Sequence, residues 1–129
     1  MIDATESLIT RLGKGDVMAA KCPSRALLRH VTSQWGVLVL VVLLKGTLRY
    51  SEIKQRIGGI SEKMLAQTLR TLEADGFIHR TVHPVVPPHV DYQLTEAGEE
   101  VARRIAELVD WIETHLDTLP NIQAHLSDE

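Results

Sequence analysis

Hydrophobic residues recur with different periods along the chain, and these periods predict its elements. Residues 37–44 are apolar without interruption, and Gly46 follows them, which predicts a helix over residues 34–45 that is buried on all sides. A buried strand is the less favoured alternative because the segment is long for a strand. Spanning a bilayer takes about 20 apolar residues, so this run does not predict a membrane segment.

Two shorter amphipathic helices follow, separated by the glycines at positions 58 and 59. The first is predicted over residues 51–57, with Ser51 as its N-cap. Ile53 and Ile57 lie four residues apart and share its inward face. A short glycine turn between two short helices is typical of a helix-turn-helix, in which the second helix crosses the first steeply.

The second of these helices is predicted to begin after Ser61 and to end at Gly76. At 100° per residue, Leu65, Leu69 and Leu72 form one narrow stripe that faces the core. The outward and flanking positions carry polar, cationic or small groups, namely Lys63, Met64, Gln67, Thr68, Arg70 and Thr71. Such groups are able to contact base edges or phosphates in DNA, although an ordinary surface helix in water has a similar outer face.

A hairpin is predicted next, with strands over residues 77–83 and 89–94. Three of the five residues from 84 to 88 are proline and lack an N–H, so this segment is expected to protrude as a stiff loop. Residues 48–50 are expected to add a short third strand. A hairpin beside such a helix is a wing, which reaches a minor groove or the backbone. Its candidate phosphate contacts are Arg80, His83 and His89.

The two ends of the chain carry apolar stripes that predict a partner surface. After Thr95, a helix of about 20 residues repeats apolar positions at spacings of three and four, namely Val101, Ile105, Leu108, Ile112 and Leu116. An N-terminal helix is expected to carry Ile2, Leu8, Ile9 and Leu12. Pairing of two copies would bury these stripes, with Trp111 as an anchor, whereas the alternative is a long helix folded back on its own core.

The predicted fold is therefore mainly α with a small antiparallel β-hairpin (α+β), a winged helix-turn-helix with N- and C-terminal dimerisation helices. We expect residues 1–129 to form one domain, with residues 1–20 and 96–129 as the dimerisation extensions. The net charge is -3, but residues 45–80 hold seven basic and four acidic side chains, 7 - 4 = +3. Residues 96–129 hold two basic and nine acidic side chains, 2 - 9 = -7. The basic segment is therefore suited to face DNA, and the acidic segment is expected to face away from it.

The single cysteine, Cys22, has no partner within the chain and fits a reducing compartment. Pro23 is favoured at the first position of a helix, which is predicted over residues 23–31. The positive end of that helix, with Lys21 and Arg25 nearby, is expected to favour the thiolate. Cys22 is thus a redox-sensing candidate, and its alternative role is that of a small buried hydrophobe.

Histidines suggest a second kind of site. His79 and His83 lie four apart on one strand, and His89 could come opposite them across the hairpin, which sketches a three-histidine metal site. No cysteine or carboxylate clearly completes this site, and Asp91 is the only acid nearby. Solvent or phosphate contacts are the commoner role of such histidines, so no metal and no cofactor is expected. Catalysis is also not expected, because Cys22 and His30 would lie roughly 12 Å apart along a helix.

Several motifs occur together in one order: Cys22-Pro23, Trp35, residues 46–53, residues 60–65, residues 69–76, and the stretch from Pro87 to Thr95. In these motifs the chain resembles the HxlR family of bacterial winged-helix transcriptional regulators, which are related to the MarR type. The resemblance extends from Cys22 to about Trp111. It implies a cytoplasmic homodimer that binds double-stranded DNA, and a Cys at the position of Cys22 that serves some relatives as a sensor. The contacts it carries over are Ser51, Ser61, Lys63, Gln67, Thr68 and Arg70.

A two-fold dimer predicts an inverted-repeat operator with half-sites about ten base pairs apart. A small-molecule effector is expected, if there is one, in a pocket near Trp35 and Trp111 between the wing domain and the dimer helices. Operator sequence, effector identity and the choice between repression and activation stay open. A winged helix that binds only protein is the remaining alternative, which salt-dependent duplex binding would distinguish.

Overall fold

A computed structural model of the chain describes residues 16–120 and residue 122. Its elements in chain order are α2 (Pro23–Thr32), α3 (Gln34–Leu43), β1 (Leu48–Arg49), α4 (Tyr50–Arg56), α5 (Glu62–Ala74), β2 (Ile78–His83), β3 (His89–Leu94), α6 (Glu96–Thr114) and the 3₁₀ turn η1 (Leu116–Thr118). The mainly helical fold with a small antiparallel sheet and a winged helix-turn-helix is confirmed. The predicted N-terminal helix with Ile2, Leu8, Ile9 and Leu12 lies outside the described residues.

Helix α3 forms the centre of the domain. Its residues Val39, Leu40 and Leu43 are fully or almost fully buried, and it packs against α2, α4, α5, α6 and β3. The predicted burial on all sides is only partly right, because the remaining Val and Leu side chains of α3 are half-buried. The helix ends at Leu43, two residues earlier than predicted, and the Gly46 N–H donates to the Leu43 carbonyl in the tight turn that follows.

Helix α4 begins one residue earlier than predicted, and Ser51 is not its N-cap. Arg49 holds the cap position, and its N–H donates to the Glu52 carboxylate at 2.9 Å. A carboxylate three residues into the helix can satisfy a free N–H at the helix start, which removes the need for the serine. Ser51 instead lies exposed in the first turn of α4.

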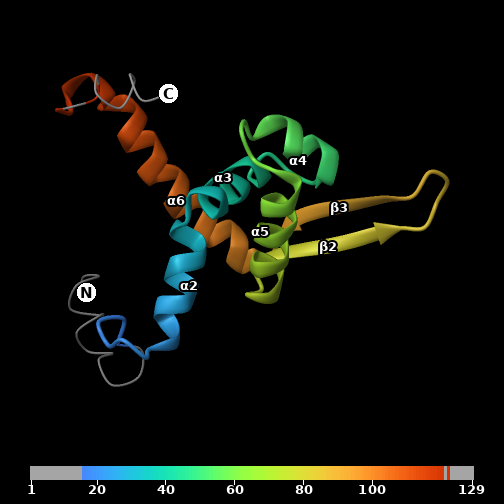
Figure 1. The fold of residues 1–129 in the computed structure, drawn as a ribbon, viewed down its shortest axis with the longest axis horizontal. Helices are drawn as coiled ribbons and strands as arrows, with labels where there is room; N and C mark the ends of the chain where they lie inside the picture. Colours follow the sequence, from blue (N-terminus) through green and yellow to red (C-terminus); the bar gives the residue numbers. More distant parts are fainter. Residues whose placement is uncertain (1–15, 121, 123–129) are drawn as a thin grey trace.

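The sheet has the strand order β1-β3-β2, and both pairings are antiparallel. The predicted third strand is confirmed as the two-residue β1, in which Leu48 faces Tyr92. Leu48, Ile78 and Tyr92 are buried against the helices. Strands β2 and β3 extend beyond β1 and carry the loop of residues 84–88 away from the helices, as Figure 1 shows. The predicted wing is therefore present.

Helix α6 matches the predicted long helix and has two different halves. Thr95 caps it by accepting the Gly98 N–H at 3.0 Å, and Gly98, Ala102 and Ile105 are buried. Its second half leaves the body of the domain on the side away from the wing (Figure 1). The exposed apolar side chains there are Leu108 (54%), Trp111 (51%), Ile112 (41%) and, just after the helix, Leu116 (38%). The folded-back alternative therefore holds only for the first half.

Among the described residues, no helix by itself is long and apolar enough to cross a membrane. Helices α2 and α3 reach the length and apolar composition of a membrane span only when they are taken together, and they meet at a bend of 70°. Three of the α3 side chains are buried in the core of the domain.

Candidate nucleic-acid interface

Helix α5 is held firmly at both ends and along one face. The Ser61 hydroxyl accepts the Met64 N–H at 3.0 Å, as expected of an N-cap. At the other end, Gly76 adopts φ +86°, and the Phe77 N–H donates to the Leu72 carbonyl at 2.9 Å, which closes a Schellman motif. The three leucines predicted to face the core, Leu65, Leu69 and Leu72, are buried. The predicted bounds and inward face of this helix are confirmed.

The opposite face of α5 points to solvent. Lys63, Gln67 and Arg70 are all exposed, and none of their side chains takes part in a hydrogen bond or ion pair within the described part of the chain. Ser61 is exposed at the N-terminus of the helix, where its oxygen is already used for the cap. We call Lys63, Gln67 and Arg70 the outer trio.

One flank of α5 borders helix α2 instead of open solvent. Thr68 and Thr71 are half-buried, and the Thr68 hydroxyl donates to the Met64 carbonyl at 2.7 Å. A cavity of about 310 Å³ lies on this flank, and its lining includes Arg29, His30, Trp35, Met64, Thr68 and Thr71. The predicted pocket near both tryptophans is thus only partly right, because Trp111 does not line this cavity and stacks on His115 instead.

The other flank of α5 faces the sheet. A hollow of about 350 Å³ lies between Arg70 of α5 and Arg80 of β2, with Tyr50 and Tyr92 in its lining. The Tyr50 hydroxyl donates to the Glu62 carbonyl at 3.1 Å and so connects the start of α4 to the start of α5. Burial, with smaller contributions from the Glu62 charge and from Tyr92, raises the pKa of Tyr50 above its usual value, which keeps this donor protonated.

The wing presents its three candidate contacts differently. Arg80 is exposed, whereas His83 and His89 are half-buried and gather around Asp91. The loop at the tip of the wing and Ser51 of α4 line a shared hollow of about 480 Å³. The alternation of buried and exposed residues in β3 begins only at Tyr92, because His89, Val90 and Asp91 are all half-buried.

The predicted three-histidine group is not what the hairpin brings together. His83 is the cross-strand partner of His89, whereas His79 faces Gln93 near the other end of β2. Four residues of strand separate His79 from His83 by about 13 Å. The group that does converge is His83, His89 and Asp91, whose ligand atoms all lie within 4.8 Å of one another. The register brings His83 opposite His89, and the period of two along β3 places Asp91 on the same face as His89.

Cys22 occupies the N-cap position of α2, as predicted, and is half-buried. The nearby Arg25 guanidinium donates to the carbonyls of Val17 and Met18, both at 2.9 Å. At the other end of α2, His30 Nδ1 and Asp75 Oδ2 form a hydrogen bond at 2.7 Å, which no pattern in the sequence predicted. That contact ties α2 to the C-cap residue of α5.

Comparisons with known proteins agree with this architecture. Residues 30–120 match the HxlR-like helix-turn-helix family. The chain is 56% identical over 110 residues to the HTH-type transcriptional regulator YtfH of Escherichia coli (strain K12), covering 85% of this chain and 87% of that protein. A structure of the transcriptional regulator ytfH from Salmonella typhimurium superposes with a TM-score of 0.78 at 53% identity, covering 88% of this chain and 99% of that one.

The redox regulator HypR in its oxidized form has a TM-score of 0.66 to this chain at 33% identity, covering 72% of this chain and 96% of HypR. Together with the capped helix α5 and the wing, these matches establish that the chain belongs to the HxlR-like helix-turn-helix family of transcriptional regulators.

Proposed function

We propose that this transcriptional regulator binds an inverted-repeat operator as a homodimer, with α5 in the major groove of each half-site. The observation that carries the proposal is the outer trio, which projects from a helix whose opposite face is fixed by three buried leucines. A rigid helix of this kind presents its side chains in a defined geometry, as base readout requires. Gln67 and Arg70 are assigned to bases, and Lys63 to phosphate.

The wing and the helix starts supply the remaining proposed contacts. Arg80 lies beyond Arg70 on the same side of the domain and is assigned to phosphate, with His83 and His89 near the tip as further candidates. Ser51 and Ser61 stand in the first turn and at the cap of their helices, where backbone N–H groups favour an anion. Met64, Thr68 and Thr71 border α2 and are assigned to apolar contacts at the edge of the groove.

Dimerisation is proposed through the second half of α6. Leu108, Trp111, Ile112 and Leu116 expose apolar side chains on a helix that extends out of the domain. Monomeric proteins rarely leave a contiguous apolar patch of this kind in water, and a two-fold axis would bury the patch of each copy against the other. A two-fold dimer in turn predicts two half-sites about one DNA turn apart.

Selection of bound duplexes from a random pool tests the proposal. The wild type is expected to enrich an inverted repeat, and the Gln67→Ala, Arg70→Ala double variant is expected to lose that selectivity. Arg103→Ala is the matched control, since it removes an exposed cation from α6, which is not part of the proposed reading face. If the wild type enriches no duplex at any salt concentration, the domain is a protein-binding module and the proposal fails.

A second proposed property is a thiol switch at Cys22. The similarity of this chain to the redox regulator HypR favours this proposal. The chain has one cysteine, so a disulfide that forms between cysteines of this protein has to join two subunits. Helix α2 carries Cys22 at its start and borders α5 near its end, so a shift of α2 would displace α5. Diamide is expected to lower operator affinity and to produce a dimer on non-reducing gels. Unchanged affinity, or the same loss in Cys22→Ser, would refute the switch.

The cavity between α2 and α5 is the proposed place for a small-molecule effector. It combines the Trp35 ring with the cationic Arg29 and the neighbouring His30, a lining that suits a small aromatic anion. Titration with a fluorescent aromatic carboxylate is expected to quench Trp35, and Trp35→Leu should abolish the response. Quenching that persists in Trp35→Leu would place the binding elsewhere, at Trp111.

A further inference from the structure

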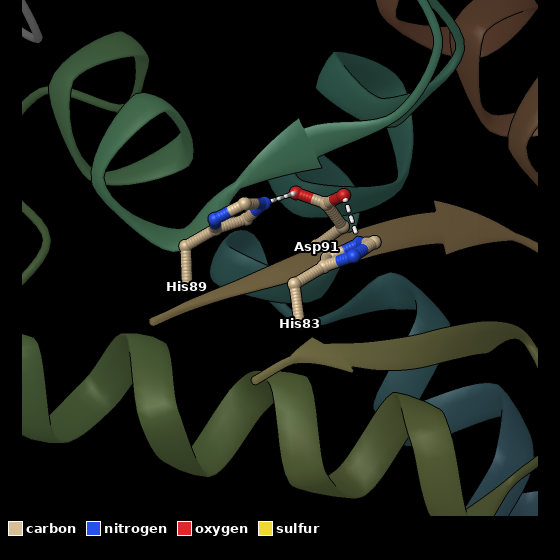
Figure 2. A group of neighbouring side chains, drawn as sticks. All are labelled: His83, His89 and Asp91. Atoms are coloured by element: carbon tan, nitrogen blue, oxygen red, sulfur yellow. Dashed lines mark ion pairs between the residues drawn. The ribbon is translucent and has the colours of Figure 1, made fainter. Parts of the chain in front are cut away.

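Three potential metal ligands meet on one face of the wing. His83 and His89 are direct cross-strand partners where β2 and β3 end at the tip loop. Asp91 lies two residues beyond His89, so the period of two in a strand places it on the same face. Figure 2 shows the Asp91 carboxylate beside both imidazole rings, with one oxygen directed at each.

The distances between the ligand atoms are close to those of a metal site. His83 Nε2 lies 2.7 Å from Asp91 Oδ2, and His89 Nε2 lies 3.9 Å from Asp91 Oδ1. A tetrahedral zinc ion with bonds of about 2.0–2.1 Å holds its ligand atoms about 3.4 Å apart. The two observed distances involve different oxygens of the carboxylate, and one ligand atom from each of the three residues lies within 4.8 Å of the other two. Small rotations of the side chains therefore suffice to place all three atoms around one ion.

The donor set identifies the class of ion. Two imidazole nitrogens with one carboxylate suit zinc and other divalent first-row transition metals, whereas calcium and magnesium prefer oxygen ligands throughout. The two rings also stack, with centroids 4.6 Å apart, which aligns their edges toward the carboxylate. The side chains are 40%, 26% and 23% exposed for His83, His89 and Asp91, so an ion can reach them from solvent.

We propose that His83, His89 and Asp91 form a binding site for a divalent transition-metal ion on the wing, with water completing its coordination. The ion takes the place of the proton in the His83–Asp91 hydrogen bond, and the neutral imidazole carries that proton on its other nitrogen, Nδ1. The site joins the two ends of the loop of residues 84–88. Metal binding thus fixes the base of this loop and adds two positive charges near the tip of the wing.

Cobalt and zinc titrations of the untagged full chain test the site. A Cys22→Ser background removes the single thiol as a competing ligand. We expect one ion per chain, measured by Co²⁺ visible absorption and by Zn²⁺ competition with a chromophoric chelator. Affinity is expected to fall by at least about 10-fold in His83→Ala and in Asp91→Asn, since even the loss of an outer-shell partner has an effect of this size.

His79→Ala is the matched control, because His79 is on the same strand but pairs with Gln93 at the far end of the hairpin. Its affinity should equal that of the background protein. Binding that survives both His83→Ala and Asp91→Asn, or that is lost equally in His79→Ala, overturns the proposal. Circular dichroism of each variant checks that the fold is retained, and His83→Gln offers a second, more conservative replacement.

A consequence for DNA rests on the proposed function and is measured separately. Zn²⁺ is expected to raise the affinity of the background protein for its selected duplex and to leave that of Asp91→Asn unchanged. A chain that binds zinc but no duplex overturns the proposed function and leaves the metal site standing. A chain that binds duplex but no zinc overturns the metal site alone.

Discussion

The salt dependence of duplex binding gives a quantitative test of the proposed interface. Each protomer presents two exposed cations that are assigned to phosphate, Lys63 and Arg80, which makes four in a dimer. Neutralising four phosphates gives a slope of about -3.6 for log K against log salt, at about -0.9 per phosphate. Affinity should then fall about 150-fold between about 50 and 200 mM salt.

Removal of one cation per protomer changes this slope by a predictable amount. Lys63→Ala should reduce the slope to about -1.8, and the fall over the same salt range to about 12-fold. Fluorescence anisotropy with one labelled duplex measures both, and Arg103→Ala should keep the wild-type slope because that cation lies on α6. A wild-type monomer on one half-site would also give about -1.8. An unchanged slope in Lys63→Ala would refute the assignment of Lys63 to phosphate.

Three further predictions concern assembly and stability. Ile112→Glu should convert the dimer to a monomer in analytical ultracentrifugation with the helical content retained, and a persisting dimer would exclude this surface. Gly98→Ala should lower the free energy of unfolding by about 1–3 kcal/mol, because its Cβ would lie 1.9 Å from the Phe77 carbonyl oxygen; urea denaturation will reveal whether the backbone accommodates it. Gly59→Ala should cost about 1–2 kcal/mol, since Gly59 has φ +82°, whereas Gly58→Ala should be neutral or slightly stabilising; equal effects would contradict this account of the turn.

Features that depend on neighbouring residues were predictable from the sequence. The Ser61 cap, the stop at Gly76 and the leucine stripe of α5 all follow from spacings of three or four residues and from one helix period. The start of α4 was missed because two local signals compete there. A serine at position 51 resembles a cap, but Glu52 reaches back to the N–H of Arg49 and fixes the helix start earlier.

Features that depend on packing between distant segments were not predictable. The position of α2 beside α5 turns Thr68 and Thr71 from outward positions into cavity-lining ones, and nothing within α5 encodes that neighbour. The hydrogen bond of His30 with Asp75 joins residues 45 positions apart. Strand register is equally invisible in a single strand, which is why the predicted metal group included His79, a residue that pairs with Gln93 at the far end of the hairpin.

The way α5 is fixed limits how a signal can change DNA binding. Its two ends are capped and its inner face is buried, so partial unfolding of α5 would sacrifice several stabilising contacts at once. Helix α3 packs against both α5 and α6. If two copies pair through α6, then the packing of α3 between α6 and α5 determines the distance between the two α5 helices. The proposed signal at Cys22 or in the α2–α5 cavity would therefore break the fewest contacts by displacing whole helices and changing that distance. An operator with fixed half-site spacing would then bind less tightly.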